Sequence, residues 1–128
     1  MRIIVYGTLK KGGALSSYMF DSEYVGKHTV TGFKMYDTGF GYPFIARSGK
    51  DDFIQGEEYK IDSLLLRKLD MVEGVHSGLF ERVDLMEEKP SRFKKPTYLY
   101  ISDADDRWGD KAELREVKGG FWKPKQDG

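Results

Sequence analysis

The sequence predicts an α+β fold, in which about six short strands curl into a sheet or barrel beside one helix. Most apolar segments are short, alternating or β-branched, and glycine or proline turns separate them. Only one segment shows clear helical periodicity. A chain of 128 residues suits one domain with its own core. We therefore expect one domain over residues 1–128, with its body in residues 2–101 and a tail in residues 102–128.

The first half of the chain predicts strands joined by glycine turns. Residues 2–6 form a short buried strand, because their apolar side chains are β-branched. A single helical turn is expected at residues 15–20. Residues 24–36 alternate loosely and predict one or two strands with a break near Gly32. The glycine-rich segment 37–43 is expected to be a loop.

Two further strands precede the helix. Residues 44–46 predict a short strand, and residues 53–61 predict a longer one with Gly56 as a bulge. Asp62 then suits the N-cap of a helix that ends at Glu73, with Gly74 following it as the left-handed residue. The apolar stripe of this helix consists of Leu65, Leu66, Leu69 and Val72.

The last third of the chain predicts two strands and a tail. Residues 79–86 alternate apolar and charged side chains, which indicates a strand with one solvent-exposed face. A charged connection over residues 87–95 leads to a strand at 97–101. An exposed loop is expected at residues 103–107. Trp108 and residues 121–122 are expected to pack the tail back onto the body.

Composition narrows the function classes. The chain is 39% hydrophobic and has 21 basic and 21 acidic residues, so no global field favours nucleic acid or an anionic membrane. No apolar run reaches the roughly 20 residues of a spanning helix, and from the first residues we expect no signal peptide. Cysteine is absent, and His28 and His76 have no metal-ligand spacing. We expect a cytosolic protein with no metal and no cofactor.

The segment Tyr6-Gly7-Thr8-Leu9 is the first candidate site. A strand that runs into a glycine turn presents successive main-chain N–H groups, which can hold a carboxylate or an oxyanion. Gly7 is expected to adopt a backbone angle that other residues resist, and Thr8 adds a hydroxyl donor. The alternative is an ordinary turn, with Lys10 and Lys11 solvated.

Glu73 is the second candidate. A carboxylate at a helix C-terminus meets the negative end of the helix dipole, which raises its pKa, as burial would. A raised pKa suits a group that takes and gives a proton near neutral pH. The alternative is an exposed last residue of an amphipathic helix. Asp70 lies one turn earlier and either shares the site or faces solvent.

Five segments, in this order, resemble the γ-glutamyl cyclotransferase-like proteins, most closely their γ-glutamylamine cyclotransferase branch. They are 5–10 (Val-Tyr-Gly-Thr-Leu-Lys), 41–43 (Gly-Tyr-Pro), 56–59 (Gly-Glu-Glu-Tyr), 69–74 (Leu-Asp-Met-Val-Glu-Gly) and 80–83 (Phe-Glu-Arg-Val). The resemblance spans residues 2–101. It implies a small mixed β-barrel with flanking helices, and a small-molecule γ-glutamyl substrate.

The chemistry that this resemblance implies is intramolecular. The α-amino group of a γ-glutamyl unit attacks its own γ-carbonyl, releasing 5-oxoproline and an amine. Main-chain N–H groups at Tyr6, Gly7, Thr8 and Leu9 would hold the substrate, and Glu73 would move the proton. No metal, nucleotide or cysteine is required.

Three points stay open at this stage. Tyr6 and Tyr42 either line the pocket or are core aromatics, and we favour the core for the Tyr6 ring. Relatives commonly carry tyrosine where this chain has Phe80. The alternatives to an enzyme are therefore a non-catalytic module that binds a small carboxylate, or an interaction protein with a vestigial pocket. The sequence does not specify the leaving amine or the oligomeric state.

Overall fold

The computed structural model describes residues 1–103, 108 and 114–123. Its strands are β1 (Arg2–Val5), β2 (Glu23–Thr31), β3 (Phe33–Asp37), β4 (Pro43–Arg47), β5 (Phe53–Lys60), β6 (Glu81–Asp84), β7 (Thr97–Ile101) and β8 (Arg115–Glu116). Its helices are α1 (Ser63–Val72), the single turn α2 (Leu85–Glu88), and the 3-10 turns η1 (Ser16–Met19) and η2 (Lys118–Gly120). The predicted α+β class is confirmed.

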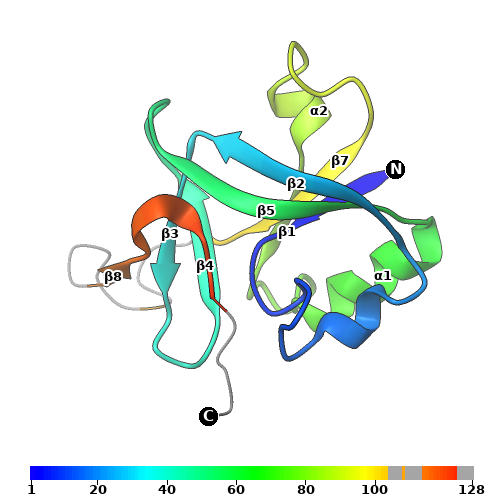
Figure 1. Ribbon diagram of the computed structural model, residues 1–128, viewed down its shortest axis with the longest axis horizontal. Coiled ribbons are helices and arrows are strands. Elements are labelled where there is room, and N and C mark those ends of the chain that lie inside the picture. The colour runs from blue at the N-terminus through cyan, green and yellow to red at the C-terminus, as the bar shows by residue number, and fades with distance from the viewer. Residues whose placement is uncertain (104–107, 109–113, 124–128) are drawn as a thin grey trace.

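The strands form two sheets, of which the larger is mixed and the smaller is antiparallel. A five-stranded sheet has the order β2-β5-β1-β7-β6, and a three-stranded sheet has the order β4-β3-β8. β1 lies at the centre of the larger sheet, antiparallel to β5 and parallel to β7. In Figure 1 the smaller sheet lies at the left, α1 at the lower right and α2 at the top. The C-terminal end of β1 therefore points into the middle of the molecule.

The two sheets do not close into the barrel that the family resemblance implied. Within the described residues, no strand ladder joins the larger sheet to the smaller one. β7 ends at Ile101, and the Ser102 N–H that follows it donates to the Ile45 carbonyl of β4 at 2.8 Å. One hydrogen bond between main-chain groups and the bond from the Arg47 N–H to Asp103 Oδ1 at 2.9 Å link the sheets there, in place of a continuous pairing.

The core has two apolar clusters, one on each side of β1. Ile3 and Val5 belong to one cluster, and Ile4 and Tyr6 to the other, because successive strand residues point to opposite faces. The α1 stripe joins the first cluster through its buried leucines. α1 is thereby fixed against the face of β1 that leads to the candidate site.

The helix begins and ends as the sequence predicts. The Asp62 carboxylate accepts a hydrogen bond from the Leu65 N–H at 2.8 Å, which caps the first turn. Gly74 follows the C-cap Glu73 with φ of 65°. The break near Gly32 is also confirmed, since this residue has φ of 88° between β2 and β3.

Two local predictions were wrong. The strand expected over residues 79–86 covers only Glu81–Asp84, because the Asp84 carboxylate accepts the Met86 N–H at 2.9 Å and starts α2. The bulge lies between Tyr24 and Gly26 of β2 and not at Gly56. Gly56 is instead a close-packing position, where a Cβ atom would lie 2.6 Å from Ile4 Cγ2.

The tail packs back onto the body where it is described. Trp108 joins the first cluster and Trp122 the second, whereas Phe121 stays 44% exposed. Residues 104–107 of the expected exposed loop lie outside the described residues. Lys10 is buried and not solvated, since its Nζ donates to the Trp122 carbonyl at 2.6 Å and lies 3.7 Å from the Phe121 ring centre.

Candidate active site

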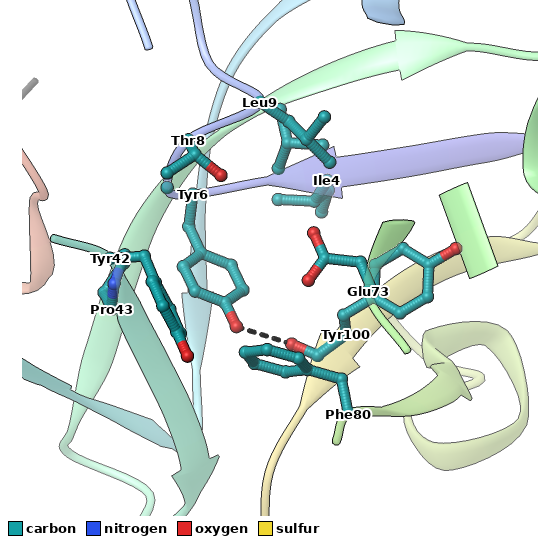
Figure 2. A pocket seen from close by; sticks show the side chains of 11 residues that line it. Ile4, Tyr6, Thr8, Leu9, Tyr42, Pro43, Glu73, Phe80 and Tyr100 are labelled. Carbon is teal, nitrogen blue, oxygen red and sulfur yellow. Dashed lines mark hydrogen bonds between the residues drawn. The ribbon is translucent and has the colours of Figure 1, made fainter. Parts of the chain in front are cut away.

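A hollow opens where β1 ends, against the C-terminal end of α1. It holds about 370 Å³ of empty space, part of it open to solvent. Its walls come from Ile4, Val5, Tyr6, Gly7, Thr8, Leu9, Tyr42, Pro43, Glu73, Phe80 and Tyr100. The predicted turn and the predicted acid thus line one hollow (Figure 2).

The turn after β1 forms the first wall. The Lys10 N–H donates to the Gly7 carbonyl at 3.1 Å, and the Leu15 N–H donates to the Thr8 carbonyl at 2.9 Å. Within the described part of the chain, no hydrogen bond uses the main-chain N–H of Gly7, Thr8 or Leu9. These three donors are the groups that the sequence singled out for an anion.

Gly7 is required for a reason that the sequence did not reveal. It is not among the glycines with positive φ, so the expected unusual backbone angle is absent. A Cβ atom at this position would instead lie 2.9 Å from both Cδ and Cγ of Pro43. Close approach of the turn to the start of β4 therefore excludes a side chain.

Glu73 forms the second wall. It is the C-cap of α1, where its N–H donates to the Leu69 carbonyl at 2.9 Å. The residue is half-buried, and Figure 2 shows its carboxylate between Tyr6, Ile4 and Tyr100. Burial raises the pKa of Glu73 to about 7. The alternative of an exposed helix end is wrong.

Three phenols surround this carboxylate. Tyr6 comes from the end of β1, Tyr42 from the loop before β4, and Tyr100 from β7. Burial and the nearby Glu73 carboxylate raise the pKa of Tyr6 and of Tyr42. Burial and the hydrogen bond to Asp70 do the same to the pKa of Tyr100, to which Glu73 adds. All three phenols remain protonated near neutral pH.

Each phenol also has a place in the packing. The Tyr6 hydroxyl donates to the Tyr100 carbonyl at 2.7 Å, so Tyr6 belongs to the core and lines the hollow at once. Tyr42 packs edge-on against Trp108, with ring centres 5.6 Å apart. Phe80 is buried, and its ring centre lies 6.1 Å from the ring centre of the same Trp108.

The sequence missed Tyr100 as a site residue and left the place of Asp70 open. The Tyr100 hydroxyl donates to Asp70 Oδ1 at 2.7 Å, and Arg82 Nη1 donates to Asp70 Oδ2 at 2.6 Å. Asp70 is therefore bonded beside the site and does not face solvent freely. The sequence did contain one signal for Asp70, because its spacing of one helical turn from Glu73 places both side chains on the same side of the helix. No residue near Asp70 in the sequence indicates that Tyr100 of β7 is its partner.

Metal chemistry has no ligand set in the described part of the chain, where no group of three or more His, Cys, Asp or Glu side chains is placed to hold an ion. Likewise, none of the described helices is long and apolar enough to cross a membrane. His76 is exposed and lines a neighbouring hollow with Asp70 and Arg82, not the one that Glu73 faces. What the candidate site offers is one carboxylate, three phenols and main-chain donors.

The fold and the site define a small mixed-sheet protein with one half-buried carboxylate opposite a turn rich in main-chain donors. The profile of the family described as "Gamma-glutamyl cyclotransferase, AIG2-like" matches residues 3–124. The chain belongs to this family. Members of the family act on small γ-glutamyl substrates.

Individual relatives agree with this assignment. The γ-L-glutamyl-butirosin B γ-glutamyl cyclotransferase of Niallia circulans is 26% identical, over 98% of this chain and 84% of its own. An AIG2-like protein of Mus musculus superposes with a TM-score of 0.69 at 22% identity, covering 99% and 97% of the two chains. Protein ytfP of Escherichia coli superposes with a TM-score of 0.67 at 25% identity, covering 95% of this chain and 96% of its own. These structural likenesses show the fold.

Proposed function

We propose that this protein is a γ-glutamyl cyclotransferase that acts on a γ-glutamyl amine or a γ-glutamyl amino acid. The α-amino nitrogen of the glutamyl unit attacks its own γ-carbonyl carbon, the bond from that carbon to the leaving nitrogen breaks, and 5-oxoproline and a free amine are released. One observation carries the proposal: a single hollow is lined both by the turn Tyr6–Leu9 and by Glu73.

The turn supplies the groups that bind. The N–H donors of Gly7, Thr8 and Leu9 hold the oxygens of the glutamyl unit, and the Thr8 hydroxyl adds a further donor. Donors that are fixed before the reaction stabilise the negative charge that develops on the attacked carbonyl oxygen. Tyr6 and Tyr42 close the sides of the binding space.

Glu73 moves the proton. It takes a proton from the α-ammonium group, which frees the nitrogen lone pair, and then gives that proton to the departing nitrogen. A pKa of about 7 suits both steps, because the carboxyl group exchanges its proton readily near neutral pH. After the attack the ring nitrogen still carries one surplus proton, which the restored Glu73 carboxylate takes and passes to the free amine, so that the amine leaves as an ammonium ion.

The tethered reaction explains why such a small site suffices. Nucleophile and electrophile belong to the same molecule, so the protein has to fold the substrate into a ring-like conformer and not to bring two molecules together. The leaving amine is the least defined part of the substrate. The relative from Niallia circulans is named for a γ-glutamyl derivative of butirosin B, which supports including large amines among the substrates to be tested.

The test is a panel of γ-glutamyl amines and γ-glutamyl dipeptides, with 5-oxoproline measured by mass spectrometry. We expect turnover of at least one donor by the wild-type protein. Glu73→Gln and Glu73→Ala should lower kcat by about 10²–10⁴, the range of general acid–base catalysis. Glu23→Gln is the matched control, because Glu23 is an exposed glutamate paired with Lys60 on β5. Wild-type turnover in Glu73→Gln would rule out the assigned role.

The second candidate is a module that binds a small carboxylate without chemistry. Phe80 favours it, because this buried ring brings no hydroxyl group to the hollow. Calorimetric binding of 5-oxoproline, together with no product from any donor of the panel, would support the module. Release of 5-oxoproline from any donor would exclude it.

A further inference from the structure

Tyr100 connects the two walls of the hollow. It lies on β7, is 3% exposed, and forms a hydrogen bond at each end. Its carbonyl accepts the Tyr6 hydroxyl at 2.7 Å, and its own hydroxyl donates to Asp70 Oδ1 at 2.7 Å. One residue thus contacts both the strand that leads to the binding turn and the helix that carries Glu73.

Asp70 carries this connection into α1. It lies one helical turn before Glu73, and its side chain is 14% exposed. Its second oxygen accepts Arg82 Nη1 of β6 at 2.6 Å. The last turn of the helix is therefore bonded to two neighbouring strands of the larger sheet, through one carboxylate.

We propose that Tyr100 is a positioning residue, which holds the Glu73 carboxylate at a fixed place relative to the Tyr6–Leu9 turn; this inference rests on the proposed function. A helix end is the part of a helix most prone to fray, since its last carbonyls lack intrahelical partners. A bond one turn before the C-cap restrains that fraying where the proton shuttle is carried.

The Tyr100 hydroxyl does not itself touch the reacting atoms. Figure 2 shows the Tyr100 ring beside Glu73, with its hydroxyl on the side away from the hollow. The phenols whose pKa the Glu73 charge raises are Tyr6 directly after β1, Tyr42 from the β3–β4 loop and Tyr100 from β7. The charges of Asp70 and Arg82 offset each other, so Tyr100 acts on Glu73 through geometry and through exclusion of water.

The first experiment compares Tyr100→Phe, Asp70→Asn and the double variant. We expect Tyr100→Phe to lower kcat by about ten- to a hundredfold, because a small misplacement of a catalytic group has an effect of this size. KM should change less than about twofold, since uniform binding is untouched. The double variant should lose no more turnover than the more damaging of the two single variants, because both single changes break the same bond.

Tyr59→Phe is the matched control. The Tyr59 hydroxyl donates to Glu57 Oε1 at 2.9 Å, and the residue is buried, but it does not line the hollow. Its loss removes a tyrosine–carboxylate bond elsewhere in the same sheet. We expect its thermal stability to fall like that of Tyr100→Phe, with turnover unchanged.

A second readout does not depend on turnover. The side-chain carboxyl resonance of Glu73 is followed by NMR against pH in protein labelled with carbon-13 glutamate, and Glu73→Gln identifies the signal. In Tyr100→Phe, water reaches the loosened helix end. The midpoint pH of the Glu73 titration should therefore fall by about 0.5 pH units or more, toward the ordinary glutamate range. Tyr59→Phe should leave the midpoint unchanged.

The outcomes separate the two claims. A lowered midpoint in Tyr100→Phe alone supports positioning, even if the wild-type protein releases no 5-oxoproline and the proposed function fails. An unchanged or raised midpoint overturns positioning, even if the wild-type protein is an active cyclotransferase. Equal loss of turnover in Tyr100→Phe and Tyr59→Phe also overturns it.

Discussion

The two walls of the hollow are built in different ways. The turn Tyr6–Leu9 offers main-chain donors, and its shape is fixed by close packing of Gly7 against Pro43. The opposite wall depends on one carboxylate, held at a helix end by the bonds of Asp70. Close packing determines the position of the donors in the first wall, and burial determines the pKa of the carboxylate in the second. Changes in the first should alter binding, and changes in the second should alter the chemical step.

The walls differ in their effect on stability as well. The turn places no carboxylate or basic side chain in the hollow, whereas Glu73 is half-buried with its pKa raised to about 7. A buried carboxylate opposes folding once it is charged. The acid wall is therefore the place where activity and stability should respond in opposite directions.

The largest expected effect comes from Glu73→Gln. An ordinary glutamate has a pKa near 4.3, so between that pH and about 7 the native state binds more protons than the unfolded state. Wild-type stability should therefore fall as pH rises through this window and level off above it. Glu73→Gln lacks this loss and should be more stable at pH 8 by on the order of 2–3 kcal/mol, while its kcat drops.

Urea unfolding at pH 5 and pH 8 measures this difference. Glu23→Gln serves again as the control and should stay within about 0.5 kcal/mol of the wild type at both pH values. Equal wild-type and Glu73→Gln stabilities at pH 8 would mean that Glu73 is hydrated like a surface carboxylate. The proposed contrast between the walls would then disappear.

An intermediate effect is expected from Gly7→Ala. The added methyl group would lie 2.9 Å from Pro43 Cδ and Cγ, so the turn or β4 has to move. We expect a loss of about 1–3 kcal/mol in unfolding free energy and a rise in KM of about tenfold, because one misplaced donor weakens binding by about 1.4 kcal/mol. The pH at which kcat is half-maximal should not change.

Gly49→Ala is the control for that change. A Cβ atom there has its nearest neighbour at 3.7 Å, the flexible Asp52 carboxylate, and no unusual φ is required. Steady-state kinetics and urea unfolding of both alanine variants decide the matter. A Gly7→Ala protein with normal KM and lowered kcat would place the two walls in the wrong roles.

The smallest effect is expected from Phe80→Tyr. The Tyr6 and Tyr100 rings shield Glu73 while their hydroxyls are bonded to the Tyr100 carbonyl and to Asp70, so we do not expect the reaction to depend on a phenol hydroxyl at position 80. We expect kcat and KM to change by less than about threefold, below 1 kcal/mol in transition-state stabilisation. Steady-state kinetics on the best donor of the panel measures both. A rise in kcat of about tenfold or more would show that the missing hydroxyl limits the reaction.

Local signals made part of this molecule predictable from the sequence. The α1 cap at Asp62, the left-handed Gly74 and the break at Gly32 each depend on residues close to them in the chain. The raised pKa of Glu73 was also expected, because a helix end and burial act in the same direction. The prediction that the turn and Glu73 would line a common hollow came from a family resemblance and not from periodicity.

Long-range contacts explain what could not be predicted. The need for glycine at position 7 arises from Pro43 on another sheet. The Tyr100–Asp70 bond joins residues 30 apart in the sequence. The open arrangement of the two sheets depends on where β7 stops relative to β4, which alternation of side chains does not reveal. The burial of Lys10 likewise depends on the tail.

The position of Trp108 gives this protein an optical reporter of its own. Its indole packs against Tyr42 and Phe80, which both line the hollow, whereas Trp122, the other of the two tryptophans, packs in the opposite cluster. Replacing Trp122 by phenylalanine would leave Trp108, beside the hollow, as the one tryptophan. Its emission would then follow the arrival of an unlabelled ligand in real time, without any knowledge of which amine departs.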